Sequence, residues 1–470
     1  YIRKAAALGI IATPSGGKNN TFRPYDECLR GEAFIMLANI MKKIESGYIP
    51  APNPTVNDYF EPLNITTKTL SLGIGFQMGN FNHYTKTGFS LDGVVPLTFS
   101  HEYNSYNTTL PDAFFGSREV KGKTETYQPL GIGWSHTYHS YITLVGKGTD
   151  ARAIVHWGGG NIHIYKSDGT KMHPESIGVY DDMTVNYNEV IIRTKSKTEY
   201  RFTNQGGTGA MVLYLSSVTD RNGNQLNINY SEGQNGTMNI SSVSDGQREL
   251  KFKYKTGTNL IESIIDPIGR SIRFQYTYNK PLDAYALTSF IDAEGNCTNY
   301  EYGDAGNRGT AFLLQRVQLP KGNYIENEYE ANRRLKNTVS GMNGVPTTKT
   351  SVSVSANYQG QAKTSSMIHV KRNGQTSKFA YNYNSNNVMT RMNGDEGLNI
   401  SASYNDNAQP QLPTSVKSNN SDISKINYDE RGNVTEIRVS SIDNSEVHTT
   451  RMTYDENNNI TSQTDANGNT

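Results

Sequence analysis

Histidine is the residue type in this sequence best suited to metal binding or proton transfer, and its spacing argues against both roles. His136 and His139 are three positions apart on an expected strand, so their side chains point to opposite faces and share a metal ion only if a bulge intervenes. His156 and His163 flank an expected hairpin, where no carboxylate or cysteine completes a tetrahedral site. We therefore expect ordinary strand positions for these histidines, with no metal ion and no catalytic residue.

The remaining chemistry-bearing patterns are also weak. Cys28 and Cys297 lie in different predicted domains, which excludes a disulfide framework and a cysteine-rich metal site. Turns of the form Asp-x-Asn-Gly-Asn present oxygen atoms that suit calcium, but the nonapeptide spacing of calcium-binding β-rolls is missing. The sequence contains no P-loop, no dinucleotide-binding fingerprint and no nucleophile elbow. These observations predict a protein that is not an enzyme and uses no cofactor.

Composition and charge exclude further classes of function. Lys and Arg number 45 and Asp and Glu 44, and the resulting net charge of +1 argues against nucleic-acid binding through bulk charge. No apolar run reaches the roughly 18–20 residues of a membrane-spanning helix. The 30 Tyr and 43 Gly, beside a hydrophobic fraction of 35 %, are typical of many short strands joined by tight turns.

A turn of fixed pattern recurs along the chain: Asp, two variable residues, Gly, then Asn or Arg. Asp266 and Asp292 are 26 residues apart, and so are Tyr428 and Tyr454. Asp at the start of such a turn accepts bonds from backbone N–H groups, and Gly in the fourth position adopts a positive φ. The expected structural residues of the repeats are Asp220, Gly223, Asp266, Gly269, Asp292, Gly295, Gly322, Tyr428, Asp429, Gly432, Tyr454, Asp455, Asp465 and Gly468.

Alternating strands, many of which end in Tyr, separate these turns, as in Leu226–Tyr230 and Ile272–Tyr276. Two strands and two turns fill one period, so each repeat is one hairpin. A single hairpin is marginal in water, so neighbouring hairpins must pair edge to edge. The pattern therefore predicts a mainly β protein, and the Tyr ring buries area while its hydroxyl still finds a partner.

These repeats resemble YD repeats, named for pairs such as Tyr428-Asp429. Two earlier segments, Pro96–Ser105 and Pro129–Tyr138, resemble the domain that opens Rhs and YD-repeat proteins. The likeness covers about residues 75–470, although residues 340–400 depart from the pattern. It implies a spiral β-sheet that forms part of a hollow shell, which in the bacterial members encloses a C-terminal toxin. The closing core of Rhs proteins is absent, so the resemblance supplies no catalytic residue.

The first part of the chain follows a helical pattern instead. Residues 1–47 resemble a truncated S-layer homology repeat, which implies a small α-helical module that binds secondary cell-wall polysaccharide. Arg30 and Glu32 match the family and are its candidate carbohydrate-binding residues, with Arg30 facing an anionic sugar. The charge of Glu32 also suits the start of the second expected helix. Pro-rich residues 48–71 are an expected linker.

The expected organisation continues with an Rhs-type β domain over residues 72–200 and a YD-repeat shell segment over residues 201–470. The chain begins at Tyr1 and ends within a repeated pattern, so we expect a piece of a longer polypeptide. The prediction is a non-catalytic scaffold of an exported, wall-anchored bacterial toxin, with cell-wall polysaccharide and a C-terminal toxin cargo as partners. Its location would be the bacterial cell wall or surface. A surface adhesin or carbohydrate-binding protein is the alternative, since exposed Tyr, Asn and Thr also suit glycans.

Overall fold

The structure is a computed structural model. It describes residues 74–75, 81–108, 117–120, 123–126, 128–158, 162–175, 179–186, 188–205, 212–304, 310–331, 333–356, 362–371, 374–384, 388–397, 399–419, 422–440 and 447–470. The expected helical module (1–47), with Arg30 and Glu32, and the expected linker (48–71) lie outside the described residues.

One antiparallel ladder contains most of the described strands, which pair in chain order from β7 to β34. Its first half consists of β7 (Tyr141–Val145), β8 (Arg152–His156), β9 (Ile162–Ser167), β10 (Met172–Pro174), β11 (Asp182–Val185), β12 (Glu189–Arg193), β13 (Glu199–Thr203), β14 (Val212–Thr219), β15 (Gln225–Glu232), β16 (Met238–Ser244), β17 (Glu249–Tyr254), β18 (Ile261–Ile265), β19 (Ser271–Asn279) and β20 (Ala284–Ile291).

The second half consists of β21 (Cys297–Tyr302), β22 (Leu314–Gln318), β23 (Asn323–Tyr329), β24 (Leu335–Met342), β25 (Val345–Ala356), β26 (Ala362–Lys371), β27 (Thr376–Tyr383), β28 (Met389–Gly394), β29 (Asn399–Ser403), β30 (Ser415–Ser418), β31 (Asp422–Tyr428), β32 (Val434–Ser440), β33 (Val447–Tyr454) and β34 (Ile460–Thr464). The ladder runs without a break through the irregular residues 340–400. The boundary expected at residue 200 falls inside β13, so the ladder is continuous there too.

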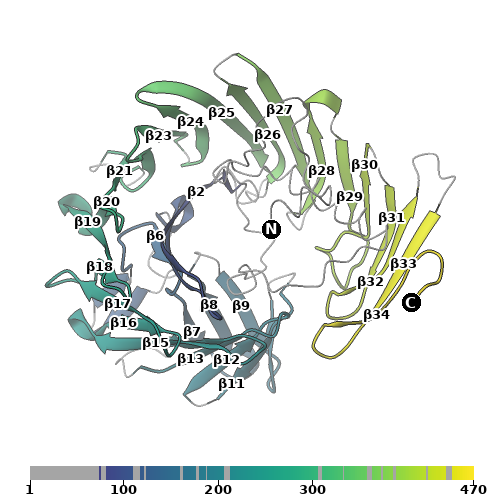
Figure 1. Cartoon of the computed structure of the whole chain (residues 1–470), viewed down its shortest axis with the longest axis horizontal. Helices are drawn as coiled ribbons and strands as arrows, with labels where there is room; N and C mark the ends of the chain where they lie inside the picture. The colour runs from purple at the N-terminus through teal and green to yellow at the C-terminus, as the bar shows by residue number, and fades with distance from the viewer. Residues whose placement is uncertain are drawn as a thin grey trace.

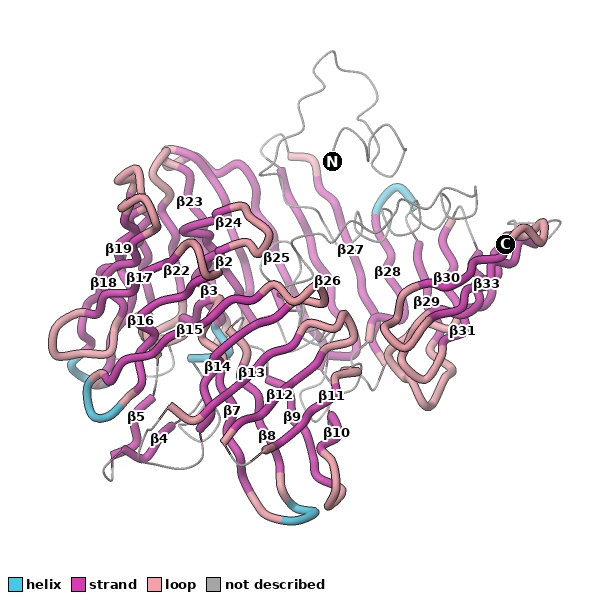
Figure 2. Tube along the Cα trace, turned by 60° about the horizontal axis from the view of Figure 1, so that its bottom comes forward, coloured by secondary structure: helices cyan, strands magenta, loops and turns pink. Residues whose placement is uncertain are grey.

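The ladder curves into a ring, and Figure 2 shows its strands side by side in chain order. The first part of β14 pairs with β7, with Leu213 opposite Ile142, which closes the strands from β7 to β14 on themselves. The rest of β14 pairs with β15, from which the ladder continues around the ring in Figure 1. The N-terminal edge of the ladder is therefore already paired.

A smaller sheet lies inside this curve (Figure 1). It contains β1 (Ile74–Gly75), β2 (Phe81–Leu91), β3 (Leu97–Asn104) and β6 (Trp134–His136), in that order. We call it the inner sheet. Strands β4 (Ser117–Val120) and β5 (Lys123–Thr126) form a separate pair. The helical turns of the described residues are 3-10 turns: Ser105–Thr108, Gly148–Asp150, Gln234–Gly236, Lys280–Leu282 and Asp395–Gly397.

The expectation that His136 and His139 lie on one strand is wrong. The chain leaves the inner sheet after β6 and enters the ladder at β7, with a turn between them in which the His139 N–H donates to the His136 carbonyl (2.9 Å). The Thr137 N–H donates to the Ser100 carbonyl of β3. This corner is missing from the alternating pattern because polar and apolar residues alternate straight through it.

A bulge and a tyrosine mark each repeat. The strand pairing shifts register immediately before Tyr230, Tyr254, Tyr276, Tyr302, Tyr329, Tyr383, Tyr428 and Tyr454. Each such tyrosine pairs with a residue of the next strand, and the residue beside that partner is left unpaired. Tyr276, for example, is opposite Leu287. Bulges bend a strand and increase its twist, and their repetition helps to curve the ladder.

Candidate functional site: the inner-sheet interface and the seam of the spiral

The inner sheet packs on the ladder through buried aromatic side chains with paired polar ends. The Tyr103 hydroxyl of β3 donates to the Phe312 carbonyl (2.8 Å) and accepts from the Leu314 N–H (3.0 Å). The Trp134 Nε1–H of β6 donates to the Tyr302 hydroxyl (2.7 Å). Tyr103 and Trp134 are almost completely buried, so these bonds satisfy groups that would otherwise be costly to bury.

Backbone contacts fix the same interface at its edges. The Ile132 N–H donates to the Tyr285 carbonyl (3.0 Å), and the Ile261 N–H donates to the Pro129 carbonyl (2.8 Å). Gly131 has φ +86°, and a Cβ there would lie 2.7 Å from the Tyr285 carbonyl oxygen. The Gly-x-Gly-Trp pattern of the sequence thus lets two backbones approach closely, which any side chain at Gly131 would prevent.

A guanidinium joins the inner sheet to a repeat turn. Arg248 donates through Nε to Asp245 Oδ2 (2.9 Å) within its own turn. It also donates through Nη1 to the Asp92 carbonyl (2.5 Å) and through Nη2 to the Val95 carbonyl (3.2 Å), both in the β2–β3 connection. The planar guanidinium can donate to several acceptors at once, so the turn at Asp245–Arg248 also holds the inner sheet.

The expected repeat aspartates lie at turns and accept from the backbone as the pattern predicts. At Asp266, the Ile268 and Arg270 N–H groups donate to Oδ1 (3.1 and 2.8 Å), and Arg270 Nε donates to Oδ2 (2.8 Å). The same pair of N–H donors reaches Asp220, Asp292, Asp429, Asp455 and Asp465. The fourth-position glycines have positive φ: Gly223, Gly269, Gly295, Gly322, Gly432 and Gly468.

Tyrosines of the repeats link successive hairpins through their hydroxyls. The sequence predicts that each hydroxyl has a hydrogen-bond partner but does not predict which group that partner is. The Tyr276 hydroxyl donates to the Ile261 carbonyl (2.6 Å), and the Tyr302 hydroxyl donates to the Leu287 carbonyl (2.6 Å). Leu287 is the residue opposite Tyr276, so the Tyr302 hydroxyl bonds the carbonyl beside the bulge that the preceding tyrosine faces. Tyr254, Tyr329, Tyr404 and Tyr454 make the same kind of bond. The Tyr230 hydroxyl donates to the Leu215 carbonyl, which lies opposite Phe202, and the Tyr428 hydroxyl donates to the Pro413 carbonyl.

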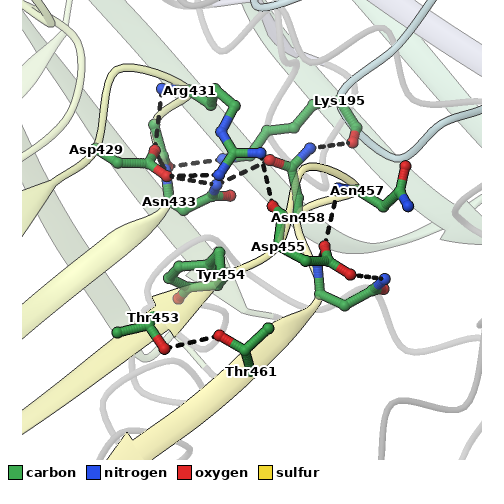
Figure 3. Close-up of polar contacts among 12 residues, drawn as sticks. Lys195, Asp429, Arg431, Asn433, Thr453, Tyr454, Asp455, Asn457, Asn458 and Thr461 are labelled. Carbon is green, nitrogen blue, oxygen red and sulfur yellow. Dashed lines mark hydrogen bonds and ion pairs between the residues drawn. The ribbon is translucent and has the colours of Figure 1, made fainter.

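Distant parts of the ladder meet at one place, which we call the seam (Figure 3). The turn between β12 and β13 contacts the turns 429–433 and 455–459 of the last repeats. Lys195 Nζ donates to the Gly432 carbonyl (2.7 Å), and Asn458 Nδ2 donates to the Lys195 carbonyl (2.8 Å). These partners are 237 and 263 residues apart in the chain, so the seam joins the two ends of the ring.

The two late turns of the seam are also bonded to each other. Arg431 Nη1 donates to the Asp455 carbonyl (2.7 Å), and Asn433 Nδ2 donates to Asn458 Oδ1 (2.9 Å). Asn458 stands where most repeats have Gly and adopts φ +63°, a conformation that Asn tolerates better than most residues. A single polar network therefore runs from Lys195 through both repeat turns.

Gly432 lies where the seam leaves no room for a side chain. A Cβ at this residue, which has φ +71°, would lie 2.8 Å from the Tyr180 ring. The Tyr180 hydroxyl donates to Gln409 Oε1 (3.0 Å), and Gln409 Nε2 donates to the Asp429 carbonyl (2.5 Å). The Lys195 ammonium lies over the Tyr180 ring, 5.5 Å from its centroid. Tyr180 thus fills the space between the early turn and the late ones.

Burial and hydrogen bonding together shift the pKa values of the charged groups at the seam. Partial burial raises the pKa of the Asp429 carboxyl, but donors from Asn433 and Arg431 outweigh it and leave this pKa below its ordinary value. Burial lowers the pKa of the Lys195 ammonium below its ordinary value, although Asp429 acts in the opposite direction. Burial also raises the pKa of Asp181, whose Oδ2 accepts from the Tyr165 hydroxyl, to about 6. These groups hold the turns together through charge and hydrogen bonds.

His136 and His139 are not arranged as their spacing predicts. The rings of His136 and His139 stack with centroids 5.6 Å apart, because the corner after β6 brings them to the same side. His163 is opposite Val155 and His156 opposite Ile162, so these two histidines lie on opposite faces of their hairpin. Among the described residues, no group of three or more His, Cys, Asp or Glu side chains could hold a metal ion. No helix of the described part is long and apolar enough to cross a membrane.

The geometry defines the structural class of this protein. It is a mainly β repeat protein whose hairpins form one curved ladder around an inner sheet. Residues 428–470, which include the late turns of the seam, match the family model described as RHS Repeat. Residues 73–165, from the inner sheet to β9, match the family model "Domain of unknown function (DUF6531)". The last part of the chain, residues 428–470, is therefore similar to RHS repeats. No curated protein sequence matches it.

Solved structures with some likeness include toxin complexes. The TcdB2-TccC3 structure is 8% identical and covers 82% of this chain and 23% of that chain, with a TM-score of 0.30. The Tc holotoxin pore of Photorhabdus luminescens is 9% identical and covers 98% and 29%, with a TM-score of 0.28. A porin-like protein from Bacteroides uniformis is 9% identical and covers 51% and 93%, with a TM-score of 0.18. The chain thus spans about a quarter of the length of the Tc toxin chains.

Proposed function

We propose that this chain is a structural scaffold, one segment of a hollow YD-repeat shell that encloses a toxin cargo belonging to the same polypeptide. The observation that carries the proposal is the unbroken ladder from β7 to β34, which curves until its ends meet at the seam. A curved ladder of this kind can form part of the wall of a shell. Polar side chains of the described residues stabilise its turns and the seam, as expected of a structural element.

The inner sheet supports the same proposal. It lies on the concave side of the ring and is held by the contacts of Tyr103, Trp134 and Arg248. A body docked inside a curved wall closes part of its opening. We propose that the inner sheet narrows one end of the shell and thereby limits access to the enclosed cargo.

The finer proposal concerns export and attachment. The resemblance of residues 1–47 to an S-layer homology repeat supports a cell-wall anchor, with Arg30 binding an anionic wall polysaccharide. The protein would then act on the outside of a bacterial cell. Its expected absence of catalysis follows from the same assignment, because a wall segment needs no reactive group.

Limited proteolysis of the full-length polypeptide tests the shell. If the shell encloses a cargo, a C-terminal fragment resists protease at concentrations that digest a separately expressed copy of that fragment. The matched control is the same polypeptide after mild denaturation, in which the fragment is digested. Equal digestion of the enclosed and separate fragments would contradict the proposal.

A binding assay tests the anchor separately. The protein with its N-terminal segment should sediment with purified cell walls, and Arg30→Ala should reduce the bound fraction severalfold. Arg3→Ala, in the same segment but outside the matched pair, is the control. Walls stripped of secondary polysaccharide should bind neither form, and unchanged binding to them would contradict the polysaccharide assignment.

A further inference from the structure

Buried histidines lie where the inner sheet meets the ladder. His101 of β3 and His136 of β6 are 0% and 1% exposed. His136 stacks on His139, and His139 lies beside Tyr141, with ring centroids 5.6 Å apart in both pairs. Tyr141 stacks on His156 at 4.3 Å. A row of four rings, three imidazoles and the phenol of Tyr141, thus runs from the inner sheet to β8 of the ladder.

Two of these histidines touch the ladder directly. The His101 ring lies 4.7 Å from the Phe290 ring of β20 and 5.5 Å from the Phe274 ring of β19. The His136 ring lies 6.1 Å from the Phe252 ring of β17. These contacts are apolar on the ladder side, so they favour the uncharged imidazole.

The hydrogen-bonding environment of both rings favours the neutral form. His136 Nδ1 accepts from the Tyr138 N–H (3.3 Å), so it has no free lone pair for a proton. His101 Nε2 is paired with the Tyr300 hydroxyl (2.8 Å), while His101 Nδ1 has no hydrogen-bond partner among the described residues. A second proton on His136 would place two donors against each other. A second proton on His101 would leave a buried N–H without an acceptor, which is costly.

No described carboxylate compensates such a proton. The charged or titratable groups acting on His101 are Lys86 of β2 and Tyr300 of β21, and those acting on His136 are His139 and His101. Burial lowers the pKa of His101 to about 3, and Lys86 lowers it further. Burial also places the pKa of His136 well below its ordinary value. The surroundings of β2, β3, β6, β17 and β19–β21 therefore oppose protonation.

We propose that His101 and His136 form an acid-sensitive latch, which holds the inner sheet against β17–β21 at neutral pH and releases it in mild acid. This inference rests on the packing and holds whatever the shell encloses. Release exposes both imidazoles to water, where they bind protons at the ordinary pKa of about 6.5. The stabilisation from their neutral burial is therefore complete above that pH and is lost progressively as the pH falls below it.

Hydrogen exchange measured by mass spectrometry tests the latch. Peptides from β2 and β3 should be protected at about pH 7.5 and should lose at least about tenfold in protection at about pH 5, after correction for intrinsic exchange rates. Peptides from β31 and β32, which contain no histidine, should keep their protection. Unchanged protection of β3 at the lower pH would overturn the proposal, and so would simultaneous loss of protection in all strands.

Substitutions that keep the acceptors but cannot titrate complete the test. Gln at position 101 places an oxygen near the Nε2 position, and Asn at position 136 places one near Nδ1. The double variant His101→Gln, His136→Asn should keep β3 protected at both pH values, whereas His173→Gln, on the exposed surface, should behave like the original protein. A double variant that retains the pH response would refute the latch. If the double variant does not fold, exchange of the imidazole C2 hydrogens in the unmodified protein provides the test. His101 and His136 must then titrate below pH 6.5, over the same pH range in which the inner sheet is released.

Discussion

At the scale of single residues, one buried carboxylate stabilises the repeat turn through several hydrogen bonds. Asp266 has a fully buried side chain and accepts from two backbone N–H groups and from Arg270. The turn at Leu319 forms the same backbone bonds without a carboxylate, with the Leu319 N–H donating to the Asn323 carbonyl (2.7 Å). Gly at the fourth position is thus enough to form the turn, and Asp adds stability to it.

Asp266→Ala should therefore destabilise the protein without changing its fold. Loss of the carboxylate leaves two N–H groups and a guanidinium without their acceptor, at a cost of about 1–3 kcal/mol. The free energy of unfolding in urea measures this cost. Ile268→Ala, at the exposed tip of the same turn, should lie within about 0.5 kcal/mol of the original protein. Equal effects of the two substitutions would show that the carboxylate has no special role.

At the scale of elements, the tyrosines explain how one hairpin recognises the next. A bulge leaves a carbonyl outside the regular pairing, and the tyrosine of the following repeat supplies the missing donor. Burial raises the pKa of Tyr254 and Tyr276 above the ordinary value, so these hydroxyls remain donors throughout the neutral range. The tyrosine of each repeat therefore selects a partner strand that contains a bulge.

Tyr276→Phe tests this selection. It removes the donor to the Ile261 carbonyl but keeps the ring, and should lower the free energy of unfolding by about 1–2 kcal/mol. Tyr278→Phe, two residues along the same strand, is the matched control because the Tyr278 hydroxyl bonds an exposed partner, Asp283. Hydrogen exchange of β18 and β19 should increase only for Tyr276→Phe. An equal increase in both variants would contradict the role of the bond.

At the scale of the whole molecule, the seam converts a long ladder into a ring. Lys195 contacts both late turns, and Tyr180 packs on Gly432. Burial of these groups is possible because their charges and N–H groups are paired across the seam. Opening of the ring would expose the whole network at once, so the seam should open and close as a unit.

Gly432→Ala should open the seam. A methyl group there meets the Tyr180 ring at 2.8 Å, in addition to the strain of an alanine at φ +71°. Gly468→Ala is the matched control, since Gly468 has φ +85° with nothing within 4 Å of its Cβ position. Both variants lose about 1 kcal/mol to backbone strain, but only Gly432→Ala should speed tryptic cleavage after Lys195. Similar cleavage rates in the two variants would mean that Gly432 does not hold the ring closed.

The parts of this architecture that are local in sequence are those that the sequence predicts. The 26-residue period fixes the hairpins, and Asp266 and Gly269 lie at a turn as the pattern requires. The corner after His136 is missed because the alternation of residue types continues through it. The contact of Lys195 with Gly432 is missed because its partners are far apart in the chain and belong to turns of ordinary composition.

The pairing of β14 with β7 has a consequence for the order in which the protein folds during synthesis. One border of the wall is sealed by its own early strands, and the one described partner of β34 is β33. New hairpins can therefore be added at one border alone, in the order in which the ribosome delivers them. Each new hairpin pairs with a strand that precedes it closely in the sequence and is already folded. The loops that must close are therefore short, which favours folding from the N-terminus onward.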